Sequence, residues 1–175
     1  MPVETKTSKK LVEILEGDYE ETLEKIREFR EILVNLRYEG RHRLGKNLRE
    51  AREALGFFTG KLARHIEVEE KVVFPFLQRY LPKLDPLILL LGSEHEEFKK
   101  NLRSFQFWLK EAGGGKNHLD HGRLLEKVRE TGNYLTYLLQ NHLQEESGIL
   151  YRVAENELRP GEKRELVKRV RQQVR

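Results

Sequence analysis

The chain contains no cysteine among its 175 residues. This absence excludes disulfide bonds, thiolate zinc sites and iron–sulfur clusters, so a metal site would have to use histidine, carboxylate or tyrosine side chains. Long apolar runs are also missing, because the longest, around residues 87–91, is far too short to span a bilayer. The polar start MPVETKTSKK has no hydrophobic segment behind it. We therefore expect a cytoplasmic protein without a membrane anchor.

Length and charge predict a single domain of nearly balanced charge with a basic C-terminal segment. At 175 residues and 38% apolar content, the chain is expected to form a single domain over residues 1–175 with one sizeable core. Residues 159–175 hold seven basic and two acidic side chains, which leaves 26 basic and 27 acidic residues before them. A charge run of this kind is usually a solvated helix face, so we do not expect the protein to bind nucleic acid.

Apolar residues recur at helical spacing along the whole chain, and no stretch shows the alternation typical of a strand. Gly40, the Asp85-Pro86 pair, the Gly113–Gly115 run and Pro160 are helix start and stop signals, and Pro75 is expected to kink the second helix. The predicted inward-facing positions include Val72 on the second helix and Ile149 and Val153 on the fourth. The prediction is an all-α, antiparallel up-and-down four-helix bundle over residues 9–158, with a short basic fifth helix over 159–175. The expected helices span residues 9–38, 44–80, 85–112 and 119–158.

Five ionisable residues occupy seam positions that the surrounding pattern reserves for apolar side chains: His65, Glu69, His95, His142 and Glu146. Four of them form two His-x-x-x-Glu pairs, and residues four apart stand on the same face of a helix. Leaving such groups dry and unpaired costs on the order of several kcal/mol each, so something must compensate them. The alternatives are a bound cation and a hydrogen-bonded network without metal, and the number of groups at one level favours the cation.

Other polar residues give weaker signals. His42, His118 and His121 fall near predicted connections and are expected to face water, as are Glu70 and Glu145. A ferritin-type centre would need Glu-x-x-His on two helices, and the only such spacing is Glu39 to His42, at a turn. Iron is favoured over zinc because two carboxylates can bridge a pair of ions and because a mixed shell of imidazole and carboxylate suits redox iron.

The stretches HIEVEEKVVFP at 65–75, SEHEEFKKNL at 93–102 and HLQEESGILY at 142–151 resemble the hemerythrin-like family of His-His-Glu cation-binding bundles. The resemblance covers about residues 10–158. It implies a non-haem centre of two iron ions, with Glu69 and Glu146 bridging the ions and histidines completing each coordination sphere.

Two positions depart from the family pattern. The family normally supplies a histidine from the first helix, where this chain has Tyr19, and the oxygen carriers have a second histidine four residues after the one on the third helix, where this chain has Lys99. These departures argue against reversible oxygen carriage by a five-histidine site. Tyr19 is either a phenolate ligand to ferric iron or a core tyrosine with a hydrogen-bonded hydroxyl, and Asp18 and Glu20 are fallback carboxylates.

The leading hypothesis for function is a di-iron protein that binds or reacts with dioxygen, peroxide or nitric oxide at an open coordination position, or that handles iron. The alternative is a non-enzymatic bundle in which the ion is mainly structural. A third hypothesis is that the basic end engages a partner in response to the state of the metal. The sequence decides neither whether the protein is an enzyme nor its oligomeric state.

Overall fold

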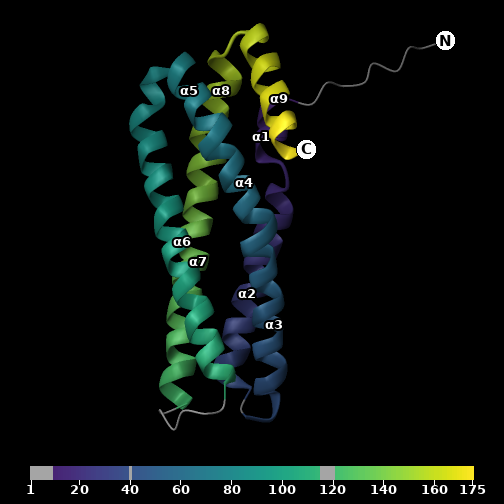
Figure 1. Cartoon of the computed structure of the whole chain (residues 1–175), viewed down its shortest axis with the longest axis vertical. Coiled ribbons are helices and arrows are strands. Elements are labelled where there is room, and N and C mark those ends of the chain that lie inside the picture. The colour runs from purple at the N-terminus through teal and green to yellow at the C-terminus, as the bar shows by residue number, and fades with distance from the viewer. Residues whose placement is uncertain (1–9, 40, 115–120) are drawn as a thin grey trace, which may run out of the picture.

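The computed structural model describes residues 10–39, 41–114 and 121–175. All regular structure in these ranges is helical, which confirms the predicted all-α class. The long helices run along the longest axis of the molecule (Figure 1). Within the described ranges no helix is long and apolar enough to cross a membrane.

The prediction of one continuous first helix is wrong. This helix is divided into α1, Leu11–Glu16, and α2, Tyr19–Tyr38. Between them Gly17 adopts φ +54°, a left-handed conformation that glycine tolerates because it lacks a Cβ. The predicted start at Lys9 and the predicted stop at Gly40 lie outside the described residues.

The second helical stretch is unbroken to Tyr80 but changes its hydrogen-bond pattern twice. After the short turn η1, Arg41–Arg43, it consists of α3, Leu44–Phe57, the π turn η2, Phe58–Leu62, α4, Ala63–Val68, the π turn η3, Glu69–Val73, and α5, Phe74–Tyr80. Pro75 lies in the first turn of α5. The π turn η3 ends two residues before this proline, where a kink was predicted.

The second half of the chain contains two further long stretches. After η4, Pro82–Leu84, come α6, Asp85–Gly113, then α7, His121–Glu145, the π turn η5, Glu146–Leu150, α8, Tyr151–Glu157, and α9, Pro160–Val174. The predicted start at Asp85-Pro86 and the stop in the glycine run are both confirmed. Residue 119, where the fourth helix was expected to begin, lies outside the described part of the chain.

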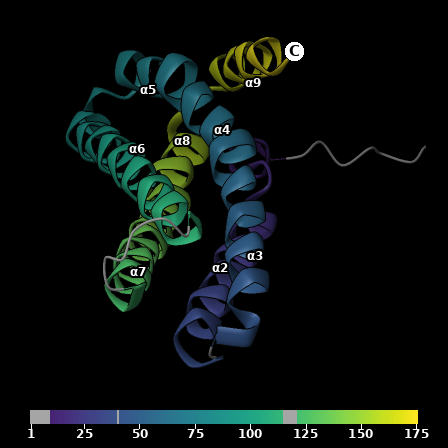
Figure 2. The same ribbon diagram turned by 60° about the horizontal axis from the view of Figure 1, so that its bottom comes forward.

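Two apolar clusters fill the interior. The first joins α2, α3, α6 and α7, and in it Phe29 packs edge-on against Phe58 and Phe105 with ring centroids 5.2 Å apart in each pair. The second lies at the other end, where α1, α5, α8 and α9 meet. Figure 2 shows α6 beside α7 and α2 beside α3, the pairs that also contact each other.

The candidate site lies where the two clusters meet. On α6, His95 falls between Leu91 of the second cluster and Phe98 of the first. On the preceding stretch, Glu69 falls between Ile66 of the first cluster and Phe74 of the second. Among the described residues, the buried histidine and glutamate side chains all gather at this level.

Candidate metal centre

Four of the predicted residues come together in the interior: Glu69, His95, His142 and Glu146. Each offers one ligand atom, these atoms all lie within 4.8 Å of one another, and all four residues are buried. They come from η3, α6, α7 and η5. His65, from α4, lies alongside, with its Nε2 2.9 Å from Oε1 of Glu69.

The two buried imidazoles face each other with their Nε2 atoms 3.0 Å apart. The Nδ1 of His95 lies 3.1 Å from Oε1 of Glu70, and the Nδ1 of His142 lies 2.8 Å from Oε2 of Glu94. A carboxylate only accepts, so each Nδ1 carries a proton, and in the neutral imidazoles each Nε2 is then left with a lone pair. Two facing lone pairs require a positive charge between them.

The 3.0 Å separation of the two Nε2 atoms suits a shared metal ion. Two nitrogen ligands at about 2.1 Å from one ion and at right angles to each other are about 3.0 Å apart. Burial, together with the neighbouring His95, lowers the pKa of His142, which disfavours a protonated imidazole there. The carboxylates that fix the ring orientation are the usual partners of metal-bound histidines.

The two glutamates contribute further unpaired acceptors to the same place. Oε2 of Glu69 lies 3.3 Å from Nε2 of His95, and Oε1 of Glu146 lies 3.7 Å from Nε2 of His142. Both oxygens are buried and have no hydrogen-bond partner among the described residues. Burial and the nearby Glu69 raise the pKa of Glu146 well above its ordinary value. Such orphaned acceptors are costly without a cation, so the residues present fit a metal ion.

The other oxygens of the glutamates point to a second side of the site. Nε2 of His65 lies 4.0 Å from Oε2 of Glu146, and the Tyr151 hydroxyl donates a hydrogen bond to Oε1 of Glu69. Although burial opposes the charged form, the glutamates raise the pKa of His65 well above its ordinary value. The side chain of His65 is 28% exposed, against 8% for His142, so this side is the more accessible one.

Each carboxylate of the two His-x-x-x-Glu motifs is the first residue of a π turn, η3 after Glu69 and η5 after Glu146. A π turn adds one residue to the helical repeat, and such turns are frequent at functional sites. In the present chain they shift the seam by one position: Leu150 and Ala154 are fully buried, whereas Ile149, the predicted seam residue, is 50% exposed. The predicted seam after Glu146 is therefore wrong by one residue.

Tyr19 begins α2 and is half-buried. It lines the same cavity as His65 and Glu69. Asp18, a fallback ligand, is exposed and forms an ion pair of 3.0 Å with Lys61, and Glu20 is also exposed. The structure thus places Tyr19 on the accessible side of the site.

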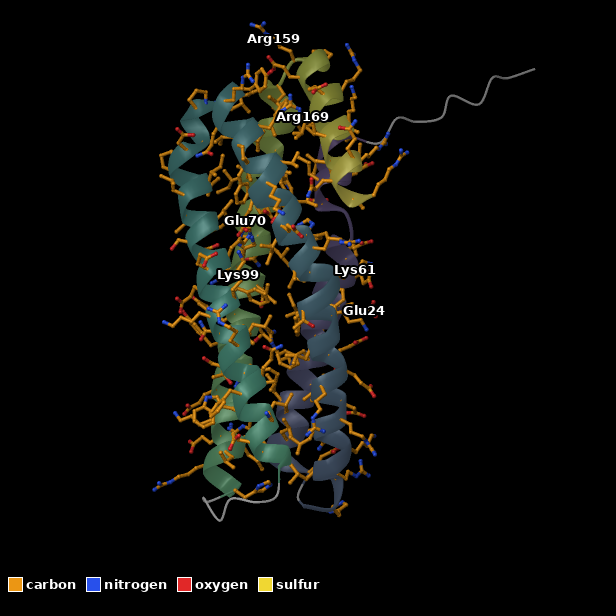
Figure 3. The ribbon with its side chains drawn as sticks, in the orientation of Figure 1. Glu24, Lys61, Glu70, Lys99, Arg159 and Arg169 are labelled. Carbon is orange, nitrogen blue, oxygen red and sulfur yellow. The ribbon has the colours of Figure 1, made fainter. Side chains whose placement is uncertain are left out.

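Several supporting residues were misjudged or missed by the sequence prediction. Glu70 does not simply face water: it holds His95, and Lys99 Nζ contacts its two oxygens at 2.8 and 3.0 Å (Figure 3). Glu145 is also partly buried. Glu94 and Tyr151 were inside the quoted motifs, but helical spacing gives no signal for the contacts they make.

The other histidines that the structure describes lie outside the buried cluster. His42 and His121 are exposed, as predicted, and His118 lies outside the described residues.

Comparison with known proteins supports the same assignment. The family model of the hemerythrin HHE cation-binding domain matches residues 10–117, which include His65, Glu69 and His95. The pair His142 and Glu146 lies beyond the matched segment, yet the fold brings it to the same place. No curated protein matches the chain. The chain belongs to the hemerythrin HHE cation-binding domain family.

Proposed function

We propose that the protein binds two iron ions at this site and that they bind or react with dioxygen, peroxide or nitric oxide, or serve iron handling. The observation that carries the proposal is a set of buried groups that face one another: two imidazole Nε2 atoms 3.0 Å apart and two carboxylate oxygens without a hydrogen-bond partner among the described residues. Imidazole and carboxylate together suit iron. The family membership supports a cation at this position.

The directions of the carboxylate oxygens favour two ions over one. Oε2 of Glu69 and Oε1 of Glu146 face the first position, between His95 and His142. The opposite oxygens face the second position, beside His65. Both glutamates would therefore bridge. The second position has fewer histidines and adjoins the cavity, so it is the one we expect to keep an open coordination site, with Tyr19 as its candidate phenolate ligand.

The residues around the ions would have distinct tasks. Glu70 and Glu94 hold the imidazoles in one orientation and tautomer. Tyr151 donates to Glu69, and its own pKa is raised well above the ordinary value by burial and by the two glutamates, so it keeps its proton. When bound, iron would supply reversible one-electron chemistry and a Lewis-acidic position for a small oxygen or nitrogen ligand.

Elemental analysis of freshly purified protein tests the proposal, together with its visible spectrum before and after peroxide. We expect about two iron atoms per chain, as in other two-metal sites, and a spectral response to peroxide. A protein that takes up no iron when expressed and reconstituted with it would contradict the proposal. Iron without any spectral response would contradict the reactive role alone.

A structural role for the ion is the second candidate, and the closed first position favours it. That position joins groups from η3, α6, α7 and η5 in the middle of the interior. If the ion is mainly structural, its removal by a chelator should unfold the protein or lower its melting temperature strongly. A folded metal-free protein with native-like circular dichroism would favour the reactive centre.

We further infer that the long helical stretches form an antiparallel up-and-down four-helix bundle with α9 as a fifth helix. Short turns such as Pro82–Leu84 and the contacts of α2 with α3 and of α6 with α7 support this topology. The basic residues of α9 are partly used within the chain: Lys163 pairs with Glu155 at 2.9 Å, and Arg169 pairs with Glu165 at 2.8 Å. This use supports our expectation that α9 does not bind nucleic acid.

A further inference from the structure

A cavity of about 390 Å³ adjoins the accessible side of the site. Its walls come from α1, α2, α4 and α9, and α9 contacts both α1 and α4 (Figures 1 and 2). His65 and Glu69 form part of the wall. The break between α1 and α2 also lines it, through Gly17 and Asp18.

The size of the cavity exceeds what a diatomic gas or hydrogen peroxide needs. A water molecule occupies about 30 Å³ of liquid, and these ligands are of comparable size. Pockets that hold small organic molecules begin at roughly 300 Å³. The cavity at 390 Å³ therefore falls in the range for an organic ligand.

The walls of the cavity are mainly apolar, and Glu16 and Arg64 are charged residues among them. The apolar part includes Leu15 of α1, Val68 of α4 and Val170 of α9. At the rim, Asp18 and Lys61 form their ion pair with side chains that are 59% and 47% exposed. At the inner end lies Glu69, which is 2% exposed, so the depth of the cavity runs from water to the candidate metal site.

We propose that this cavity binds an apolar organic molecule that carries one small oxygen-containing polar group. The volume corresponds to a ligand of on the order of ten non-hydrogen atoms. The apolar body contacts the aliphatic walls, and the polar group points toward His65 and Glu69. The role of the ligand as a substrate rests on the proposed iron centre, whereas its binding rests on the cavity alone.

Fluorine NMR with para-fluorocumyl alcohol tests the binding on the full chain as purified. We expect the probe resonance to shift or broaden with a saturable dependence on protein concentration. Iron at the second position would add paramagnetic broadening, because the probe would lie next to it. No saturable change at any accessible protein concentration would overturn the proposal.

A filling substitution locates the site. Val170→Trp on α9 places a larger side chain in the cavity and leaves His65 and Glu69 unchanged, and we expect it to weaken probe binding by roughly tenfold or more. Val170→Phe is a smaller filling variant in case the tryptophan prevents folding. Lys168→Trp is the matched control, because Lys168 is exposed on the same helix and does not line the cavity.

The outcomes separate this inference from the proposed function. Loss of probe binding in the filling variants, with binding kept in Lys168→Trp and with unchanged metal content, supports the cavity. Equal binding in all variants overturns it, whatever the metal analysis shows. Saturable binding that the filling variants abolish in a protein without iron supports the cavity and contradicts only the di-iron proposal.

Discussion

Removing the carboxylate behind His142 should weaken metal binding while leaving every ligand in place. Glu94 Oε2 lies 2.8 Å from Nδ1 of His142, and the Glu94 side chain is 22% exposed, so a leucine fits at this position without burying a new charge. In Glu94→Leu the Nδ1 proton loses its acceptor. The imidazole is then free to take the other tautomer, in which Nε2 carries a proton and cannot bind a cation.

The expected loss of metal affinity follows from the role of such contacts. Loss of a partner that orients a metal-bound histidine typically costs 10–100-fold in metal affinity, or about 1.4–2.7 kcal/mol. Glu94→Gln keeps an amide oxygen that can accept from Nδ1 but loses the negative charge, so its effect should be smaller than that of the leucine variant. The order of affinity is expected to be wild type, then glutamine, then leucine.

Competition with a chelator of known iron affinity measures this order. Glu97→Leu is the matched control, because Glu97 lies on the same helix and its carboxylate accepts from Asn101 instead of a site histidine. Circular dichroism checks that all variants remain helical. If Glu94→Leu bound metal as tightly as Glu97→Leu does, the orientation argument and the tautomer derived from it would be refuted.

Three further predictions address the accessible side, the Lys99 contact and the α9 docking. Tyr19→Phe should abolish a ferric–phenolate absorption band, and an unchanged spectrum would exclude Tyr19 as a ligand. Lys99→Met should weaken chelator-measured affinity by less than Glu94→Leu does, because it frees Glu70 without removing it, and Lys99→Arg should restore it. Although burial opposes it, the ion pair with Lys163 holds the pKa of Glu155 below its ordinary 4.5. Its stabilising effect is therefore present above pH 4.5 and is lost as the pH falls through the lowered pKa. Urea unfolding should show wild type and Glu155→Gln converging at low pH.

Much of the fold and the core of the candidate site could be predicted from the sequence because both depend on spacing. A repeat of apolar residues identifies a helix face, and His95 among leucines and phenylalanines is conspicuous in that repeat. The break at Gly17 could not be predicted in this way. Leu11, Leu15, Tyr19 and Thr22 continue the helical spacing across it, and spacing carries no information on the sign of one φ angle.

The contacts of Glu70 and Glu94 could not be predicted from the sequence for a different reason. Each precedes or follows a predicted ligand by one residue, so on an ideal helix it points about 100° away from the seam. Its side chain is long enough to reach around to an imidazole on a neighbouring helix. Whether it does so depends on the distance and rotation between helices, which the periodicity of one helix does not contain.

The π turns η3 and η5 explain why the first buried residue after Glu69 and after Glu146 comes one position later than predicted, at Val73 and at Leu150. In a regular helix Ile149 and Leu150, three and four residues after Glu146, would both lie near its face, but here Leu150 is fully buried and Ile149 is half exposed. The extra residue of η5 brings Tyr151 to Glu69, and that of η3 brings Phe74 to stack on His95 with ring centroids 5.4 Å apart. Apolar residues occupy the shifted positions, so the interior stays packed after each π turn. The shift also gives the site its buried partners.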